Sequence, residues 1–227
     1  MITRLFIFTF SIFVCGQAMT QSKSLPSFTS ISTSGSVQVE LVKSSVSKAD
    51  YTILKGDEDD LYLEVKGNEL YVKIKSRNGF WNSTNTKAKV TVHYQNLSSI
   101  DCAAGSSIKS ESEIVTDNMD IESSSGASCS IVIKSTDLNV DASSGSKVAV
   151  SGSAKSVNYD ASSGARIDAA SLLASDAIAD VSSGASISLY ASNKLNADAS
   201  SGGSIKYKGD PEKTNISSGI SGSIRSY

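Results

Sequence analysis

Acidic residues recur at one position of a repeated motif and are the strongest candidates for chemistry in this sequence. They stand four residues before the glycine of a Ser-Ser-Gly tripeptide, which is Ala-Ala-Gly in the first copy, and an amide takes this position in the last copy. The seven positions are Asp101, Glu122, Asp141, Asp160, Asp180, Asp198 and Asn215. Apolar and polar residues alternate around each glycine, so this column should point outward. Stacked strands would place its carboxylates about 4.8 Å apart, where they repel each other unless something compensates.

Three arrangements could compensate for this charge or use it. Each carboxylate could accept backbone N–H bonds from its own Ser-Ser-Gly turn, as Asp does in Asx-turns. Ca²⁺, a hard cation that prefers oxygen ligands, could bind along Asp141, Asp160, Asp180 and Asp198. Paired acids could also cleave a polysaccharide. We favour turn capping, because the calcium pattern Gly-Gly-x-Gly-x-Asp is missing and no Lys or Arg regularly accompanies the column. We therefore expect no bound metal and no cofactor.

Two aromatic residues, Phe80 and Trp81, lie in a polar loop over residues 76–86. An exposed tryptophan among polar residues can stack on a sugar ring or anchor a protein partner. The alternative is that both side chains fold back onto the rest of the chain. We retain Phe80 and Trp81 as candidate binding residues.

The sequence does not contain the residues that an enzyme of a common class would need. His93 is the only histidine, and its place in an alternating strand predicts a structural role. No Gly-x-Ser-x-Gly elbow, phosphate loop or dinucleotide fingerprint occurs. The chain carries 21 basic and 23 acidic residues without a basic stripe, which disfavours nucleic acid as a partner. These observations predict a non-catalytic protein.

The repeat itself predicts the fold that positions these residues. Its glycines follow one another at intervals of 17 to 21 residues, a period typical of stacked structural units. They are Gly105, Gly126, Gly145, Gly164, Gly184, Gly202 and Gly219. Apolar residues recur three and five positions before and after each glycine, which indicates strand, turn and strand with one face inward. We predict an all-β, right-handed β-helix or β-solenoid with rungs of about 19–20 residues.

The turn glycines are expected to adopt positive φ, where a side chain is unfavourable. A side chain at Gly164 should also meet Gly145 and Gly184 on the neighbouring rungs, whereas Ser163 should face water. Cys102 and Cys129 fall in inward columns of neighbouring rungs. They could form a disulfide in an oxidising compartment, but we favour two buried free thiols.

The chain before the repeat divides into two further segments. Residues 1–18 combine Arg4, a short apolar run and the small residues Gly16 and Ala18, which is typical of a signal peptide cleaved after Ala18. No other segment is apolar enough to cross a membrane as a helix. Residues 25–97 contain longer, more charged strands, including a hairpin at residues 61–74, and are predicted to form a β-rich cap or flank. Residues 98–227 form the Ser-Ser-Gly solenoid, and residues 25–227 are expected to be one continuous domain.

Three stretches of the chain are distinctive in their order: residues 28–41 (FTSISTSGSVQVEL), 67–74 (GNELYVKI) and 90–100 (VTVHYQNLSSI). Together they resemble a known family, the putative auto-transporter adhesin "head GIN" domain of exported bacterial proteins common in Bacteroidetes. The resemblance covers nearly the whole chain after the leader, and it implies an all-β, helix-like fold and a role at the cell surface. It supplies no catalytic motif.

The function expected from the sequence is that of an exported, adhesin-like binding or structural module, located in the periplasm, on the outer membrane or outside the cell. Rows of serine, threonine and asparagine would suit repetitive contact with glycans or surface proteins. Two alternatives stay open, a polysaccharide lyase or hydrolase built on a β-solenoid and an envelope spacer without a ligand.

Overall fold

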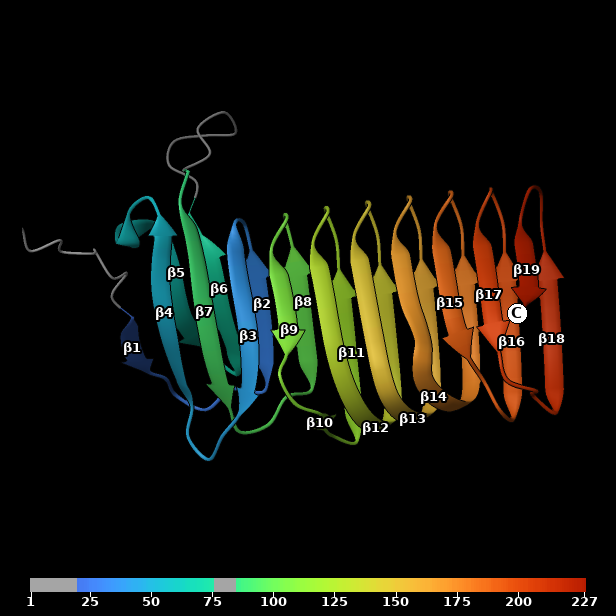
Figure 1. The fold of residues 1–227 in the computed structure, drawn as a ribbon, viewed down its shortest axis with the longest axis horizontal. Helices are drawn as coiled ribbons and strands as arrows, with labels where there is room; N and C mark the ends of the chain where they lie inside the picture. The colour runs from blue at the N-terminus through green and yellow to red at the C-terminus, as the bar shows by residue number, and fades with distance from the viewer. Residues whose placement is uncertain (1–19, 76–84) are drawn as a thin grey trace, which may run out of the picture.

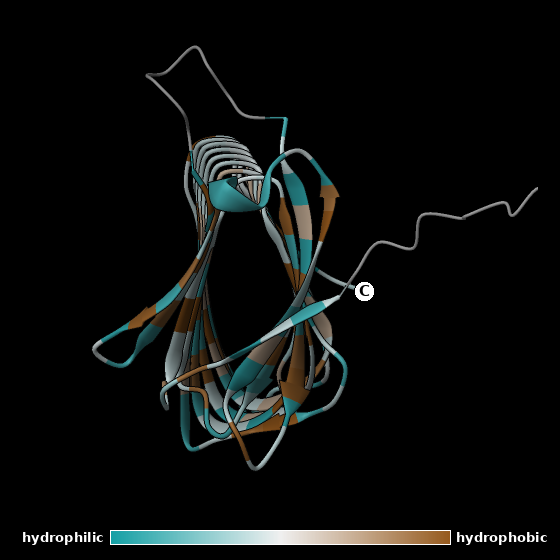
Figure 2. Ribbon diagram, turned by 90° about the vertical axis from the view of Figure 1, so that its left-hand side faces the viewer, coloured by the Kyte–Doolittle hydropathy of each residue, from teal (hydrophilic) through white to brown (hydrophobic). Residues whose placement is uncertain are grey.

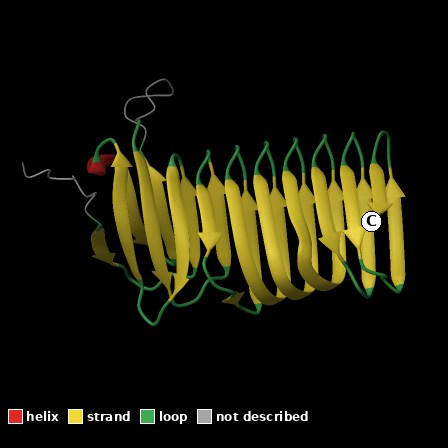
Figure 3. Ribbon diagram, viewed as in Figure 1, coloured by secondary structure: helices red, strands yellow, loops and turns green. Residues whose placement is uncertain are grey.

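The computed structural model describes residues 20–75 and 85–227, and they are almost entirely β-structure (Figures 1 and 3). Their helical content is a single 3₁₀ turn, Glu58–Asp60. Within these residues, no helix has the length and apolar character needed to cross a membrane. The strands stack side by side along one long axis, so the molecule is an elongated rod (Figure 1).

Each rung of the rod runs up one sheet and down an opposing one, and Figure 2 shows this cross-section along the axis. In spatial order, sheet A contains β5 (Leu61–Lys66), β6 (Glu69–Ile74), β2 (Ser30–Ser34), β8 (Ser99–Ala103), β11 (Asn118–Ser123), β16 (Lys194–Ala199) and β18 (Lys213–Ser218). Sheet B contains β1 (Gln21–Ser24), β4 (Lys48–Lys55), β7 (Lys87–Tyr94), β3 (Val37–Lys43), β9 (Ser107–Ser110), β15 (Ser186–Tyr190), β17 (Ser204–Lys208) and β19 (Ser223–Ser226).

Three long strands contribute to both sheets, because they continue around the edge opposite the Ser-Ser-Gly turns. They are β12 (Ser128–Ala142), β13 (Lys147–Ala161) and β14 (Arg166–Val181), and they lie between β11 and β16 in sheet A and between β9 and β15 in sheet B. The short β10 (Ile114–Val115) pairs with β12 at this curved edge.

The alternating sequence explains why these segments form stacked strands. Residues one apart point to opposite faces, so each strand buries one set of side chains and exposes the other. The parallel register places equivalent positions on top of each other, as in the series Ile121, Val140, Tyr159 and Ala179, all buried. The predicted all-β solenoid and its inward columns are confirmed. Its right-handed sense stays a prediction.

The Ser-Ser-Gly tripeptides form tight turns along one edge of the rod. In the turn at residues 162–165, φ is +51° at Ser163 and +71° at Gly164, and the Ala165 N–H donates to the Ser162 carbonyl at 3.0 Å. Two consecutive positive φ values with this hydrogen bond are typical of a type I′ turn. The serine therefore shares the left-handed conformation that was expected of the glycine alone.

One expectation about the turn glycine is wrong. A Cβ placed on Gly164 would have no neighbouring atom within 4 Å, so it would not meet Gly145 or Gly184. The turns point their tips into solvent, and the rung contact is made by the backbone, with the Gly145 N–H donating to the Ser163 carbonyl at 3.1 Å. Only the backbone conformation restricts this position to glycine.

The alignment of the last rung is also wrong by two residues. Ser218 pairs with Ala199, which places Ser221, with φ +59°, at the turn position assigned to Gly219. The turn is closed by the Gly222 N–H and the Gly219 carbonyl, 3.1 Å apart. Asn215 consequently lies beside Asn196, and the acidic column ends at Ser217.

The segment before the repeat is more than a cap, because it supplies two rungs of the solenoid in an order that the sequence does not follow. Strands β2 and β3 form a rung that pairs with β6 and β7 on one side and with β8 and β9 on the other. The chain thus leaves β3, builds the outer rung, and returns past β3 to continue the rod. The predicted hairpin is present, with β5 antiparallel to β6, and β5, β4 and β1 close this end. The boundary at residues 97 and 98 stays a prediction.

Candidate functional site

The acidic column lies on the outer face of sheet A, as its alternation predicted. Glu122, Asp141, Asp160, Asp180 and Asp198 are exposed, and parallel pairing stacks each on the next. The turn-capping hypothesis is wrong. Across residues 20–75 and 85–227 no turn N–H donates to Asp141, Asp160, Asp180 or Asp198, because the turns bond to carbonyls instead. Asp101 differs, since it accepts a hydrogen bond from the Ser32 hydroxyl at 2.9 Å.

Two of the stacked carboxylates, those of Asp141 and Asp180, have a raised pKa. Partial burial, then Asp160 and Glu122, raise the pKa of Asp141, and burial, then Asp160 and Asp198, raise the pKa of Asp180. In the described part of the chain, no group of three or more His, Cys, Asp or Glu residues is placed to hold a metal ion. The calcium alternative therefore gains no support, and the column is a source of repulsion.

Replacing Asp160 with asparagine is expected to stabilise the protein at neutral pH. A raised folded-state pKa means that stability is present in acid and is lost as pH rises through that pKa, so the folded column is least stable when fully ionised. Removing the central charge should raise the free energy of unfolding by roughly 0.5 kcal/mol at pH 7, the scale of exposed charge pairs. Urea melts at pH 7 and pH 3 would measure it. An equal gain at both pH values would contradict an electrostatic origin.

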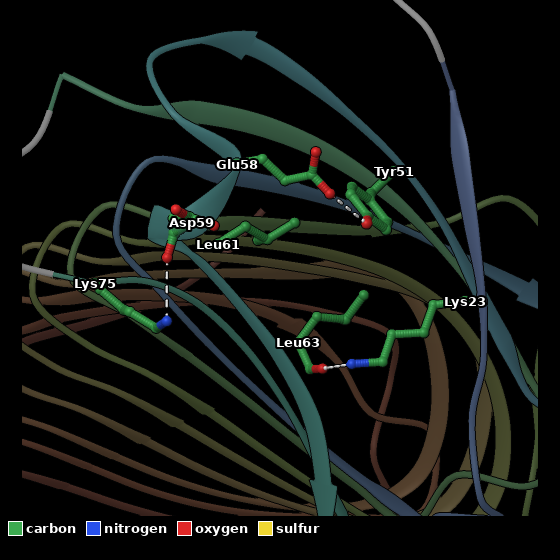
Figure 4. Close-up of a pocket in the computed structure, with 7 residues that line it drawn as sticks. All are labelled: Lys23, Tyr51, Glu58, Asp59, Leu61, Leu63 and Lys75. Atoms are coloured by element: carbon green, nitrogen blue, oxygen red, sulfur yellow. Dashed lines mark hydrogen bonds between the residues drawn. The ribbon is translucent and has the colours of Figure 1, made fainter.

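A cavity of about 240 Å³ opens between the two sheets at the end of the rod formed by β1, β4 and β5 (Figure 4). We call it the mouth pocket. Sheet B contributes Lys23 and Tyr51 and sheet A contributes Leu61 and Leu63. Glu58 and Asp59 come from the 3₁₀ turn, and Lys75 follows β6.

Hydrogen bonds hold the polar side chains of the mouth pocket in place. Lys23 Nζ donates to the Leu63 carbonyl at 2.7 Å and so links sheet B to sheet A. Tyr51 donates to Glu58 Oε1 at 2.8 Å, and Gln21 Nε2 donates to Glu58 Oε2 at 2.6 Å. Lys75 Nζ donates to the Asp59 carbonyl at 3.1 Å. Burial, and then the Glu58 carboxylate, raise the pKa of Tyr51. These bonds define the positions of the side chains on the rim.

The arrangement suits binding better than reaction. Leucine side chains form an apolar floor, while ammonium, carboxylate and phenol groups surround it, as in sites that fix a polar ligand by a few directed contacts. The mouth pocket holds neither a histidine nor a cysteine, and its hydroxyl is bonded to a carboxylate. Its lining comes from four separated segments, and the sequence analysis missed all of it. The acidic run at residues 57–60 was the one local signal.

His93 is a structural residue, as predicted. Its Nε2 lies 2.9 Å from Asp50 Oδ2, which also accepts from Lys48 Nζ at 2.8 Å. Lys48, the Ser22 hydroxyl and His93 together lower the pKa of Asp50 to about 2. The serine bonds the carboxylate and not the ring, so no nucleophile is activated.

The remaining candidates fall in different places. Phe80 and Trp81 lie outside the described residues, and their segment follows Lys75 of the mouth pocket in the sequence. Cys102 and Cys129 are both buried free thiols. The Cys102 thiol lies 3.2 Å from the Ser106 hydroxyl, and burial raises the pKa of Cys129.

Residues 27–211 match the family described as putative auto-transporter adhesin, head GIN domain. The chain belongs to this family. The resemblance inferred from residues 28–41, 67–74 and 90–100 is thereby confirmed. No curated protein matches the chain.

Solved structures of similar proteins share the solenoid of this head GIN chain. A putative adhesin from Bacteroides fragilis aligns with a TM-score of 0.80 at 22% identity, covering 92% of this chain and 96% of that one. A protein from Parabacteroides distasonis described as a putative lipid binding protein gives 0.72 at 22% identity, with 94% and 98% covered. A putative adhesin from Parabacteroides merdae gives 0.74 at 15% identity, with 94% and 97% covered. At these identities the likeness shows the fold.

Proposed function

We propose that this head GIN protein is a non-catalytic binding module of the bacterial surface, which holds the end of a glycan in the mouth pocket. The observation that supports this is an ordered ring of donors and acceptors over an apolar floor, at one end of a rigid rod. A pyranose ring has the matching character, since its hydroxyls need directed hydrogen bonds and its C–H faces pack on leucine and tyrosine. The neighbours described as adhesins agree with such a role.

The cellular setting belongs to the same proposal. Residues 1–18 act as the export leader and are removed after Ala18, so that the working protein begins at Met19 and stands in the periplasm, on the outer membrane or outside the cell. Phe80 and Trp81 come after Lys75 in the sequence, and we propose them as further binding residues.

A glycan array, followed by calorimetric titration of the best glycan, tests the proposal. Tyr51→Ala and Trp81→Ala should each weaken binding at least tenfold, whereas Ser188→Ala, on the outer face of sheet B, should bind as the wild type does. Each variant should keep the wild-type melting temperature within a few degrees, because the pocket is at the end of the rod. Binding that survives both aromatic changes would place the ligand elsewhere.

A reducing-sugar assay on polysaccharide mixtures tests the alternative that the protein is a polysaccharide lyase or hydrolase. We expect no release of reducing ends. An array without any bound glycan, under conditions where the protein is folded, would favour the spacer alternative instead.

A further inference from the structure

The two ends of the rod differ in how their exposed strand edges are protected. In the described residues sheet A begins at β5 and ends at β18, and sheet B begins at β1 and ends at β19, so each end exposes unpaired backbone groups. An open edge is a template for another strand unless charges or irregular structure protect it. The two ends lie far apart in Figure 1.

The end at β1 and β5 is protected. Lys23 points between the sheets, and its ammonium donates a hydrogen bond to the Leu63 carbonyl of the edge strand β5. Glu58, Asp59 and Lys75 add charges around the same opening. A strand docked here would bury these charges, which is unfavourable.

The end at β18 and β19 lacks such protection. Its inward positions on β18 are Thr214 and Ile216, in register with Leu195 and Ala197 of the core, and Ile216 is still 45% exposed. Ile224 of β19 lies in register with buried Ile205. No charged side chain points inward here, so the core is left open at an edge that can accept another strand.

The charges on the outer face of sheet A indicate which strand fits. Parallel stacking places Lys213 beside Lys194 at one end of the strands, and it places Ser217 beside Asp198 at the other. Residues 213–226 contain no carboxylate. A strand added antiparallel to β18 and carrying the same sequence would bring its lysine to the acidic side and its serine to the basic side.

We propose that two copies of this chain associate through β18, antiparallel and centred on Asn215, to form a two-fold dimer joined end to end. In this register Thr214 of one copy faces Ile216 of the other, so both inward sets continue the core. Lys213 faces Ser217 of the second copy, and its side chain reaches the Asp198 of that copy one strand further on. A two-fold contact uses the same surface twice and closes the assembly at two. The protected end excludes head-to-tail growth.

Sedimentation of the purified chain, with charge-swapped variants, tests the pairing. Wild type should show a monomer–dimer equilibrium. Lys213→Glu and Asp198→Lys should each weaken the dimer at least tenfold, and the double variant should return to within threefold of wild type. Lys147→Glu makes the same charge change on sheet B, away from the edge, and should leave the equilibrium unchanged. A wild type that stays monomeric at 100 micromolar, about ten times a 10 micromolar Kd, would overturn the proposal, as would a dimer indifferent to both single changes.

Cross-linking tests the register independently of charge. Facing Cα atoms of an antiparallel pair are about 4.5–5.5 Å apart, within the range of a disulfide. Asn215→Cys should therefore form a covalent dimer under mild oxidation, whereas Ser188→Cys should not. The test uses the chain that begins at Met19 and so lacks Cys15. Its native Cys102 and Cys129 are buried and should not interfere. Failure of Asn215→Cys to cross-link while the chain is dimeric would show that another surface joins the copies.

Discussion

Replacing Gly152 with alanine should destabilise the protein by more than about 3 kcal/mol, beyond the usual range for single substitutions. Gly152 lies in β13 at the curved edge, with φ +111°, and pairs with Ile133 of the preceding rung. An added Cβ would lie 2.1 Å from the Ile133 carbonyl oxygen. That atom belongs to the backbone, so relief would require separating two hydrogen-bonded rungs.

Gly164→Ala is the matched control, since Gly164 also has positive φ but an added Cβ there meets nothing within 4 Å. It should cost about 1–2 kcal/mol, the penalty of the left-handed conformation alone. Urea melts of both variants and the wild type provide the comparison. Equal losses would mean that contact between rungs does not limit the curved edge.

Tyr159→Ala should cost about 3–5 kcal/mol, the range for removing a buried aromatic side chain. Tyr159 is 0% exposed and lies between Val140 and Ala179 of the neighbouring rungs, so the narrow core has nothing to fill the space. Solenoid rungs hold each other in place, and a cavity in one should weaken the pairing on both sides.

Tyr159→Phe should instead stabilise the protein. The Tyr159 hydroxyl is buried without a hydrogen-bond partner, and leaving such a group unpaired costs about 1–3 kcal/mol. Removing the oxygen while keeping the ring should therefore raise the free energy of unfolding by about 1 kcal/mol. Thermal melts measure both changes. A destabilised phenylalanine variant would indicate that the hydroxyl binds an ordered water.

The repeat can be predicted from the sequence because the pattern that specifies it lies within each rung. Alternation fixes which side chains point inward, and recurring columns fix how rungs align, as for Ile121, Val140 and Tyr159. The error in the last rung has a physical cause, because the turn there places Ser221 at positive φ while Gly219 supplies a carbonyl. Serine can adopt the left-handed conformation at modest cost, so aligning the rungs on their glycines alone misplaces this turn.

The order of the rungs could not be predicted in the same way. Strands β2, β6 and β8 have the same pattern of inward residues, and nothing local says which lies in the middle. The mouth pocket has a similar origin, since Lys23, Tyr51 and Leu63 come from separate strands that meet only through this rung order. Gly152 was missed because the close approach that requires it belongs to the curved edge, which has no Ser-Ser-Gly signal.

The β2–β3 rung lies inside the rod, although it precedes both neighbouring rungs in the sequence. It is the template for two directions of growth, because later strands must add to both of its faces. In the sequence, β6 and β7 cover one face of this rung before β8 and β9 cover the other, and the later rungs extend the rod toward β18. The first rung in the sequence thus becomes an internal layer that is paired on both sides. Mechanical pulling on the far end should therefore separate the rungs from β18 onward and reach the β2–β3 rung late.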